Sequence, residues 1–564
     1  MPKKSSSKIF TILVGGQAGD GAREATANLA RLLAKLGYEI FISVEYPSLI
    51  RGGHNFSRLS FSAEKIYSDS AALDILVALN RDTVERHAAE LKKDAVVIYG
   101  APMDKTSAGQ NLVAMPLADW AKELSAPPLA RISAALGAVC FYFGLPLSKL
   151  DDVFQEVFKD KAEPNIKLAK HGYDHFKKLG LTPLNLPAAI GKAKPIFDGN
   201  EAFAEGLVKA GLKNYFAYPM TPSSSILHYL AKQAKNYNLK VVQPENEIAA
   251  INMALGSAIT GAPTAVASSC GGFALMLEAM CMAGNAEIPI VAADSQRAGV
   301  STGVPTRAGQ GDLNFVRFLP GEFPRLILAP GDAEESFLCG GWALEIAWRC
   351  QTPAVVLLDK HLSESSTTCD FETDKIKKAE AKEAKPGPDY KRYALTADGI
   401  SPLAFPGDKD TVVKYNSYEH DENGFITDAP EMAAAMQEKR FAKNALILKE
   451  MKKRQPLKIY GDRKAKEAIV FWGSPKGAIL EALKLIPRPL KVIQFICLEP
   501  FDSAGALKEL FGLRRIIDIE NNFTAPLAGL LREQTGVAVT DKILRYDSLP
   551  FEPTELAKKL NEIF

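Results

Sequence analysis

The chain has 564 residues, of which 47% are hydrophobic and 24% are charged, a balance typical of a globular protein with several cores. Its 68 Lys and Arg residues nearly match its 66 Asp and Glu residues, which argues against a nucleic-acid or anionic-membrane partner. None of the 7 cysteines forms a Cys-x-x-Cys pair and no apolar run reaches transmembrane length, so we expect a cytoplasmic protein with reduced thiols and no metal-binding cysteine run.

The first block of the chain, residues 1–190, opens with a strand, a glycine-rich turn and a helix. The run "KIFTILVGG" is typical of a buried strand, and "GGQAGDG" is typical of a turn. The spacing of apolar residues predicts a helix over 22–36, ended by Gly37, before the strand "YEIFIS". We interpret these elements as one βαβ unit. The alternation continues with the strands "ILVAL" and "AVVIYG" and a helix over 132–143.

Strands and helices alternate strictly in the second block, residues 191–375. The predicted strands "NYFAYP", "KVVQ", "TAVASS" and "PIVAAD" are separated by predicted helices over 223–233, 248–259 and 273–282. This alternation indicates a parallel sheet covered on both faces. Ligands of open α/β sheets bind at the carboxyl ends of the strands, so we look for chemistry there.

A lysine-rich connector and a charged helix over 431–453 make up residues 376–460, and the α/β rhythm returns in residues 461–564. The run "EHDEN" at 419–423 predicts a solvated acidic loop, because consecutive residues cannot all face one metal ion without a special turn. The last block has the strands "AIVFW", "LKVIQFIC" and "RRIIDIE", and we interpret the turn at 520–524 as a cap or an interface. The fold class we expect is α/β, with several parallel-sheet domains.

Hydroxyl side chains gather where the strand "NYFAYP" passes into a helix, in "NYFAYPMTPSSSILHYL". Pro222 suits the first position of a helix, which would make Thr221 the N-cap residue. A helix N-terminus with several hydroxyls, Ser223 among them, also offers a seat for a carboxylate. Both interpretations stay open at this point.

Charged residues stand at two more strand-to-helix junctions. Glu245 and Glu247 begin a predicted helix, where an acid either stabilises the helix end or serves as a buried general acid. Arg297 and Arg307 lie in the Gly-, Ser- and Thr-rich loop that follows "PIVAAD". An arginine in such a loop can clamp a carboxylate through two hydrogen bonds, or can simply be a surface residue.

The glycine-rich turn of the first block does not match the dinucleotide-binding pattern. Gly16, Gly19 and Gly21 stand in the order G-x-x-G-x-G, although Glu45 lies near the right distance for a ribose contact. "GDG" also resembles the start of a diphosphate–magnesium motif, but no asparagine follows at a suitable distance. The Gly-Gly turn in "YPSLIRGGHNFSRLSF" adds Arg51, and His54 beside it is interpreted as structural.

These stretches together resemble the 2-oxoacid:ferredoxin oxidoreductases, and specifically an α subunit with the γ domain fused in front. "GGQAGDG" and "YPSLIRGGHNFSRLSF" are similar to the γ domain, and "GNEAFAEGLVKAGLKNYFAYPMTPSSSI" to the start of the α subunit. "ENEIAAINMALGSAITGAPTAVASSCGGFALMLEAM", "DSQRAGVSTGVPTRAGQGDL", "EHDENG" and "ENNFTAPLAGLLR" continue it in the same order. The resemblance therefore covers nearly the whole chain.

The resemblance implies a γ-type domain over 1–190, a domain over 191–375 that binds the thiamine pyrimidine ring, a connector over 376–460, and a transketolase C-terminal-like domain over 461–564. The family decarboxylates a 2-oxoacid on thiamine diphosphate, forms an acyl-CoA and passes electrons to ferredoxin. The preferred acid would be 2-oxoglutarate, while branched-chain, indolepyruvate and broad-range specificity stay open, as does the direction of flux.

The resemblance also implies roles for individual residues. Thr221, which follows Met220 where the family usually has isoleucine, would bind the 2-oxoacid together with Ser223. Glu247 would share a proton with the pyrimidine ring, with Glu245 as its near competitor. Arg297 would pair with the substrate carboxylate.

The missing half of the site implies a β subunit that carries the diphosphate–Mg²⁺ site and a [4Fe-4S] cluster, in an (αβ)₂ assembly. Two other classes stay open. A Rossmann-type dehydrogenase subunit would bind a nucleotide through the first block, and a non-catalytic assembly subunit would lack the chemistry that Thr221, Glu247 and Arg297 indicate.

Overall fold

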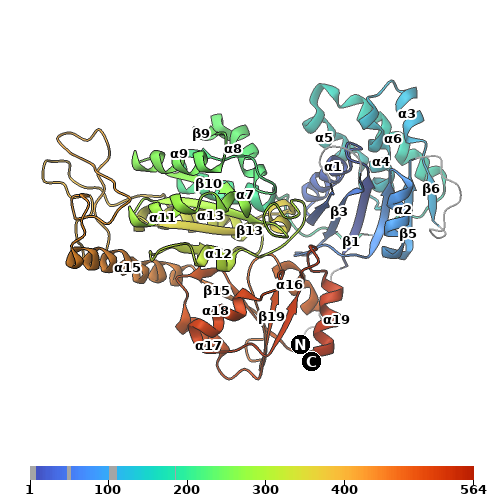
Figure 1. The fold of residues 1–564 in the computed structure, drawn as a ribbon. Coiled ribbons are helices and arrows are strands. Elements are labelled where there is room, and N and C mark those ends of the chain that lie inside the picture. The colour runs from blue at the N-terminus through green and yellow to red at the C-terminus, as the bar shows by residue number, and fades with distance from the viewer. Residues whose placement is uncertain (1–7, 48–52, 101–110, 185, 564) are drawn as a thin grey trace.

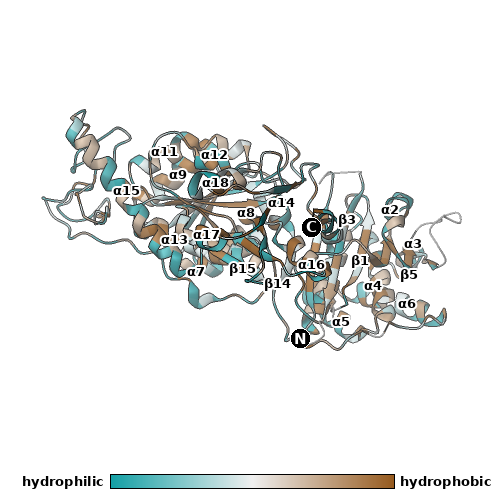
Figure 2. Cartoon of the chain, turned by 90° about the horizontal axis from the view of Figure 1, so that it is seen from below, coloured by the Kyte–Doolittle hydropathy of each residue, from teal (hydrophilic) through white to brown (hydrophobic). Residues whose placement is uncertain are grey.

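The computed structural model describes residues 8–47, 53–100, 111–184 and 186–563, and the strands of this part of the chain form three sheets (Figure 1). Each sheet lies in its own body, and the last body lies below the other two in the view of Figure 1. Hydropathy colouring shows the hydrophobic residues concentrated in the strands and inner helix faces (Figure 2). The predicted α/β class is confirmed. No helix in the described ranges is both long and apolar enough to cross a bilayer.

The first sheet has the strand order β6-β5-β4-β1-β3-β2-β14-β7. Strand β3 pairs antiparallel with both β1 and β2, so the predicted βαβ unit is wrong in its pairing, because β3 separates its two strands. The elements of this body are β1 (Phe10–Gly16), α1 (Ala22–Lys35), β2 (Glu39–Glu45), β3 (Asn55–Ser62), β4 (Leu73–Ala78), α2 (Arg81–His87), β5 (Leu91–Tyr99), β6 (Leu112–Ala114), α3 (Leu117–Glu123), α4 (Ile132–Tyr142), α5 (Leu147–Phe158), α6 (Glu163–Lys178), β7 (Ile196–Asp198) and β14 (Ser366–Thr368).

The second sheet has the order β18-β12-β13-β11-β10-β8-β9 and is parallel except for the edge strand β18. Every residue of β11 and β13 is buried, as expected for strands covered by helices on both faces. The elements are α7 (Gly199–Ala210), β8 (Asn214–Phe216), α8 (Ser224–Tyr237), β9 (Lys240–Val242), α9 (Glu247–Ile259), β10 (Thr264–Ser268), α10 (Gly271–Ala274), α11 (Leu277–Asn285), β11 (Ile290–Gln296), α12 (Leu313–Arg317), β12 (Leu326–Leu328), α13 (Ala333–Cys350), β13 (Pro353–Asp359), α14 (Lys360–Glu364) and β18 (Cys497–Glu499).

The third sheet has the order β15-β17-β16-β19-β20, with β15 antiparallel to its neighbour. The predicted strand over 490–497 divides in two here, because β17 stays in this sheet while β18 crosses to the second one. The elements are α15 (Pro430–Lys453), β15 (Leu457–Gly461), β16 (Glu467–Phe471), α16 (Lys476–Leu485), β17 (Lys491–Phe495), α17 (Ser503–Leu510), β19 (Arg515–Glu520), α18 (Pro526–Thr535), β20 (Asp541–Leu544) and α19 (Pro553–Ile563).

The connector and the charged helix are held by buried charges. Lys439 and Lys443 of α15 both pair with Glu287, which is fully buried, and the Lys439 distance is 2.5 Å. Burial would raise the pKa of Glu287, but these lysines hold that pKa well below its usual range. Glu419 pairs with Arg440 at 2.6 Å, so the run at 419–423 is not the freely solvated loop that the sequence predicts. The Glu419 carboxylate neutralises a buried arginine of the helix.

A second buried charge cluster joins the second and third bodies. Glu335 at the start of α13 is 3% exposed and accepts from Lys476 at 2.5 Å and from Lys458 at 2.9 Å. The amide of Gln494 donates to the same carboxylate at 2.6 Å. Burial alone would raise the pKa of Glu335, but the two lysines lower this pKa to about 2. The ionised carboxylate therefore binds the two bodies together.

We predict that this contact is lost on acidification. Because the folded-state pKa of Glu335 is depressed, its contribution is complete above the unfolded-state value of 4.5 and disappears as the pH falls towards about 2. Glu335→Gln should lower the free energy of unfolding at pH 7 by roughly 3 kcal/mol and flatten its acid dependence, as measured by denaturant titration. Glu467→Gln, which removes a surface pair with Arg488, is the control and should change it by less than about 1 kcal/mol. Equal effects of the two variants would contradict the prediction.

Candidate active site

Three neighbouring strands of the second sheet, β8, β10 and β11, end at the same edge. The segment after β8 carries Thr221, the end of β10 carries Ser268, and the residue after β11 is Arg297. The parallel direction of the strands therefore brings together residues that lie far apart in the sequence. The first turn of α9, with Glu247, follows the next strand in the sheet, β9.

The hydroxyl-rich turn does not cap α8 in the predicted way. The helix begins at Ser224, with Ser223 in the N-cap position, so the predicted assignment of Thr221 as N-cap and Pro222 as first helical residue is wrong. The chain makes a turn at these residues first, and the buried Ser223 hydroxyl donates to the Met220 carbonyl at 2.7 Å. The backbone carbonyl of Thr221 is thereby left to face the neighbouring strand end.

Arg297 is the residue that meets this carbonyl. Its side chain is buried, with 5% of the residue exposed, and its Nη1 donates to the Thr221 carbonyl at 2.6 Å. Its Nε is also buried and has no partner among the described residues. A buried guanidinium with one short neutral contact and an unused donor is poised to bind an anion.

Glu247 is buried, with 3% exposure, whereas Glu245 is exposed. The reason is local: Asn246 caps α9 by accepting from the Ala249 amide at 2.9 Å, which turns Glu247 inward as the first helical residue. The Ser268 hydroxyl donates to its carboxylate at 3.4 Å. A Cβ added to Gly272 would lie 2.5 Å from the same carboxylate, so this glycine is needed beside it.

The four site residues predicted from the sequence thus lie at one edge of the sheet: Thr221, Ser223, Glu247 and Arg297. Ser268 contacts both Glu247, at 3.4 Å, and the sulfur of Met220, at 3.8 Å, and Met220 adjoins Thr221. Sequence reasoning did not single out Ser268 or Gly272. The signal was present in "ASSCGG", where hydroxyls and two glycines follow a buried strand.

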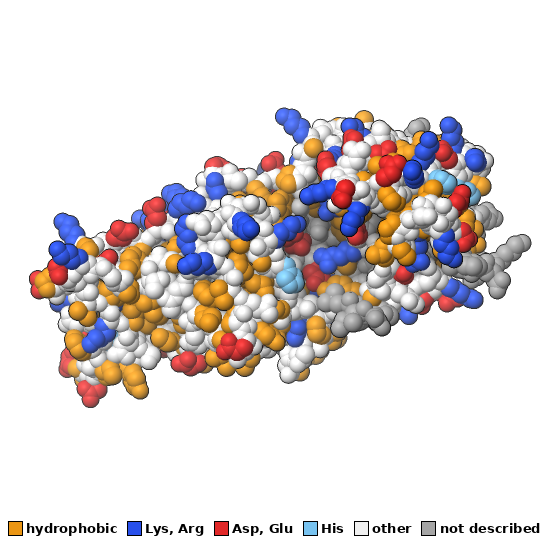
Figure 3. Space-filling view, turned by 90° about the horizontal axis from the view of Figure 1, so that it is seen from above, with side chains coloured by type: hydrophobic (Ala, Val, Ile, Leu, Met, Phe, Trp, Pro, Cys, Tyr) orange, Lys and Arg blue, Asp and Glu red, His pale blue; other side chains and the backbone are white. Residues whose placement is uncertain are grey.

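Exposed hydrophobic side chains lie on the same segments as these residues. Val300, three residues after Arg297, is 91% exposed, and Leu275, directly after α10, is 52% exposed. The others on these strand ends and helices are Tyr218, Ile248, Met253, Val304 and Phe318. Seen from above, hydrophobic side chains spread widely over the body built on the second sheet (Figure 3). Apolar surface gathered around a polar site is typical of a protein–protein interface.

The first body has a cavity of about 320 Å³ beside the glycine-rich turn, lined by residues that include Gly19, Gly21 and Arg23. Glu45 also borders it, but its carboxylate pairs with Arg307 at 2.6 Å and with Lys360 at 3.0 Å. These ion pairs link the first body to the second. The interpretation of Glu45 as a ribose ligand is therefore wrong. Arg307 forms the ion pair with Glu45 and is not one of the residues at the active-site edge.

His54, which the sequence indicates to be structural, lies in the first body against a second histidine. Its Nε2 is 2.8 Å from Nε2 of His87, and the His87 Nδ1 is 2.9 Å from Glu90. Burial and the neighbouring His87 lower the pKa of His54 to about 4. Arg51, which the sequence places nearby, lies outside the described residues.

Comparison with known proteins agrees with this arrangement. Residues 205–439 match the family described as pyruvate flavodoxin/ferredoxin oxidoreductase, thiamine diP-binding, and residues 11–175 match pyruvate ferredoxin/flavodoxin oxidoreductase. The chain is 31% identical to a 2-oxoacid:ferredoxin oxidoreductase subunit alpha of Sulfolobus sp, over 98% of this chain and 96% of that protein. It is 27% identical to the 2-oxoglutarate oxidoreductase subunit KorA of Mycobacterium tuberculosis, over 86% of this chain and 80% of that protein.

A solved structure has the same architecture. It is the 2-oxoglutarate:ferredoxin oxidoreductase from Magnetococcus marinus with 2-oxoglutarate, coenzyme A and succinyl-CoA bound. It superposes with a TM-score of 0.89 at 27% identity and covers 98% of this chain and 99% of that chain. On the strength of the match to the Sulfolobus protein over nearly its whole length, the chain belongs to the 2-oxoacid:ferredoxin oxidoreductase α subunits.

Proposed function

We propose that this chain provides the acid and the substrate clamp for the decarboxylation of 2-oxoglutarate on thiamine diphosphate. The observation that carries the proposal is that two buried ionisable groups, the carboxyl of Glu247 and the guanidinium of Arg297, lie at one sheet edge. Neither has a charged partner within ion-pair distance among the residues that the structure describes. A buried polar group without a partner is costly, so each is expected to meet one in a bound ligand.

The residues at this edge fit one end of thiamine. Glu247 offers a buried carboxyl that, among the residues with described positions, receives one long hydrogen bond, at 3.4 Å from Ser268. Gly272 keeps the space beside this carboxyl free of a side chain. A pyrimidine nitrogen placed there would satisfy the carboxyl by sharing its proton. When bound, thiamine diphosphate supplies the electron sink for decarboxylation.

We assign proton transfer and substrate binding to individual residues of this chain. Glu247 holds and returns a proton at the pyrimidine nitrogen, which a general acid in a dry site does efficiently. Arg297 binds the carboxylate of the 2-oxoacid through its unused donor and so orients the scissile bond. Thr221 adjoins Arg297 through its backbone carbonyl, and its hydroxyl would contact a substrate oxygen. Ser223 fixes the turn through its hydrogen bond to the Met220 carbonyl.

A β subunit completes the site in this proposal. It would hold the diphosphate end of the coenzyme, Mg²⁺ and a [4Fe-4S] cluster, in an (αβ)₂ assembly that delivers electrons to ferredoxin. The exposed apolar residues around the site support a partner there, as does the name "subunit alpha" of the Sulfolobus relative. Coenzyme A, which the Magnetococcus structure contains together with 2-oxoglutarate, would accept the acyl group.

The division of labour between subunits can be tested directly. The complex of this chain with its β subunit should reduce a viologen dye in the presence of thiamine diphosphate, coenzyme A and 2-oxoglutarate, as measured by absorbance. The isolated chain should not, because its site lacks the diphosphate-binding half. Equal activity of the isolated chain would overturn the proposal.

The two neighbouring glutamates form a matched pair of variants. Glu247→Gln in the complex should lower kcat at least about 100-fold, because the proton-sharing acid is lost. Glu245→Gln should leave kcat unchanged, since that side chain is exposed. Steady-state dye reduction and circular dichroism would report activity and folding. A larger loss in the Glu245 variant would reverse the assignment.

The two arginines of the loop after β11 give a second pair. Arg297→Lys should raise KM for 2-oxoglutarate on the order of tenfold, because lysine does not offer the planar fork that fits a carboxylate. Arg307→Lys, which changes only the pair with Glu45, is the control and should leave KM within about twofold. An unchanged KM in the Arg297 variant would show that the substrate carboxylate binds elsewhere.

A further inference from the structure

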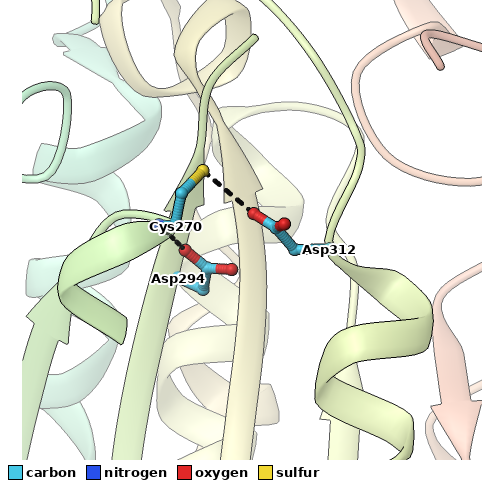
Figure 4. A group of neighbouring side chains, drawn as sticks. All are labelled: Cys270, Asp294 and Asp312. Carbon is cyan, nitrogen blue, oxygen red and sulfur yellow. Dashed lines mark hydrogen bonds between the residues drawn. The ribbon is translucent and has the colours of Figure 1, made fainter. Parts of the chain in front are cut away.

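A cysteine and two aspartates, Cys270, Asp294 and Asp312, lie close together at the active-site edge of the second sheet (Figure 4). Cys270 stands between β10 and α10, Asp294 belongs to β11, and Asp312 precedes α12. The thiol of Cys270 donates to Asp312 at 3.0 Å, and the Cys270 amide donates to Asp294 at 2.9 Å. Three segments of the active-site edge therefore meet at Cys270.

Cys270 holds the backbone of Arg297 at two points. The Arg297 amide donates to the Cys270 sulfur at 3.3 Å, and the same sulfur lies 3.6 Å from the Arg297 carbonyl. Cys270 itself has a φ of 38°, in the left-handed region that residues other than glycine rarely adopt. Such a conformation costs free energy and persists only where the surroundings enforce it. The contacts to Asp294, Asp312 and Arg297 are the ones that enforce it here.

The two aspartates have carboxyl oxygens within 4.8 Å of each other, close enough for the carboxyls to interact. Asp294 is fully buried, and one of its carboxyl oxygens has no hydrogen-bond partner in the described ranges. Burial and the Asp312 carboxyl raise the pKa of Asp294 well above its usual range, and burial also raises the pKa of Asp312. One proton retained by the pair limits its negative charge. The charge of Arg297 then stays available for a ligand.

The loop that carries Asp312 is fixed by the third body. Gln310, two residues earlier, exchanges hydrogen bonds with Asn521 in both directions, at 2.8 and 3.0 Å. The Asn522 side chain donates to the Gln310 carbonyl at 3.0 Å, and the Gln310 side chain donates to the Trp472 carbonyl at 3.2 Å. The "ENN" turn at the end of β19, interpreted from the sequence as a cap or an interface, makes these contacts between the bodies. It keeps Asp312 within reach of Cys270.

We propose that Cys270, Asp294 and Asp312 form a positioning cluster that holds Arg297 in the orientation that binds the substrate carboxylate. This inference rests on the function proposed above for Arg297. Within the described part of the chain, the side chain of Arg297 makes one hydrogen bond, to Thr221, so its direction depends on where its backbone is held. Without the thiol, the guanidinium would lose that support and bind a carboxylate in a poorer geometry.

The test uses the complex with the β subunit and a short series of variants. Cys270→Ala should raise KM for 2-oxoglutarate about tenfold, with kcat and thiamine diphosphate affinity within about twofold of the unmodified complex. Cys270→Ser, which keeps a donor towards Asp312, should recover most of the loss. Cys281→Ala, at a partly exposed cysteine of α11, is the matched control and should change nothing. Asp312→Asn should also raise KM, because an amide oxygen is a weaker acceptor for the thiol than a carboxyl oxygen that can carry charge.

Three results would overturn the inference. One is an unchanged KM in both Cys270→Ala and Asp312→Asn, and another is a joint loss of kcat, KM and thiamine affinity, which indicates a general structural role. The third is one zinc ion per chain in the purified complex that is absent from Cys270→Ala, which would make the cluster a metal site. If Cys270→Ala does not fold, Cys270→Ser and Asp312→Asn decide by the same KM criterion. Failure of the proposed function would appear instead in the unmodified complex, as a lack of dye reduction.

Discussion

The parallel alignment of β8, β10 and β11 is the constraint on which the rest of the site depends. In a parallel sheet, all strands end at one edge, and the polar residues that follow them must share a small space. Here that space contains Thr221, Ser268 and Arg297, and the cap at Asn246 adds Glu247 from the next helix. The chemistry of the site therefore follows from the strand order, since each of these residues alone is an ordinary turn or helix-end residue.

Much of the second body could be predicted from the sequence, because its buried strands are short apolar runs separated by helical periodicity. The candidate residues could also be predicted, since hydroxyls, acids and arginines stood at strand ends. The capping of α8 could not be predicted, because Pro222 fits both the first position of a helix and a turn. The choice between Glu245 and Glu247 depended on Asn246, whose cap turns one inward and leaves the other in solvent. The single helix predicted over 273–282 is broken between α10 and α11, and the sequence does not reveal this break because the apolar spacing continues through it.

Contacts between bodies lay beyond sequence reasoning. Glu45 pairs with Arg307, 262 residues away in the sequence, although its place at the end of β2 resembles that of a ribose-binding acid. The sequence analysis singled out neither Glu335 nor Glu287, yet each pairs with two lysines from another part of the chain. Buried ions of this kind are paired because an unpaired one would be too costly, yet no local pattern identifies the partner.

The first sheet includes two strands that come from beyond the predicted limit at residue 190. β14 pairs with β2, and β7 pairs with β14, so the backbone of the second block extends the sheet of the first. A break in the polypeptide between α6 and β7 would leave these ladders intact. The two fragments would remain one folded particle, held as a non-covalent heterodimer. A gene for this architecture can thus be split or fused at that point without redesigning the sheet, because the join is made by hydrogen bonds rather than by the linker.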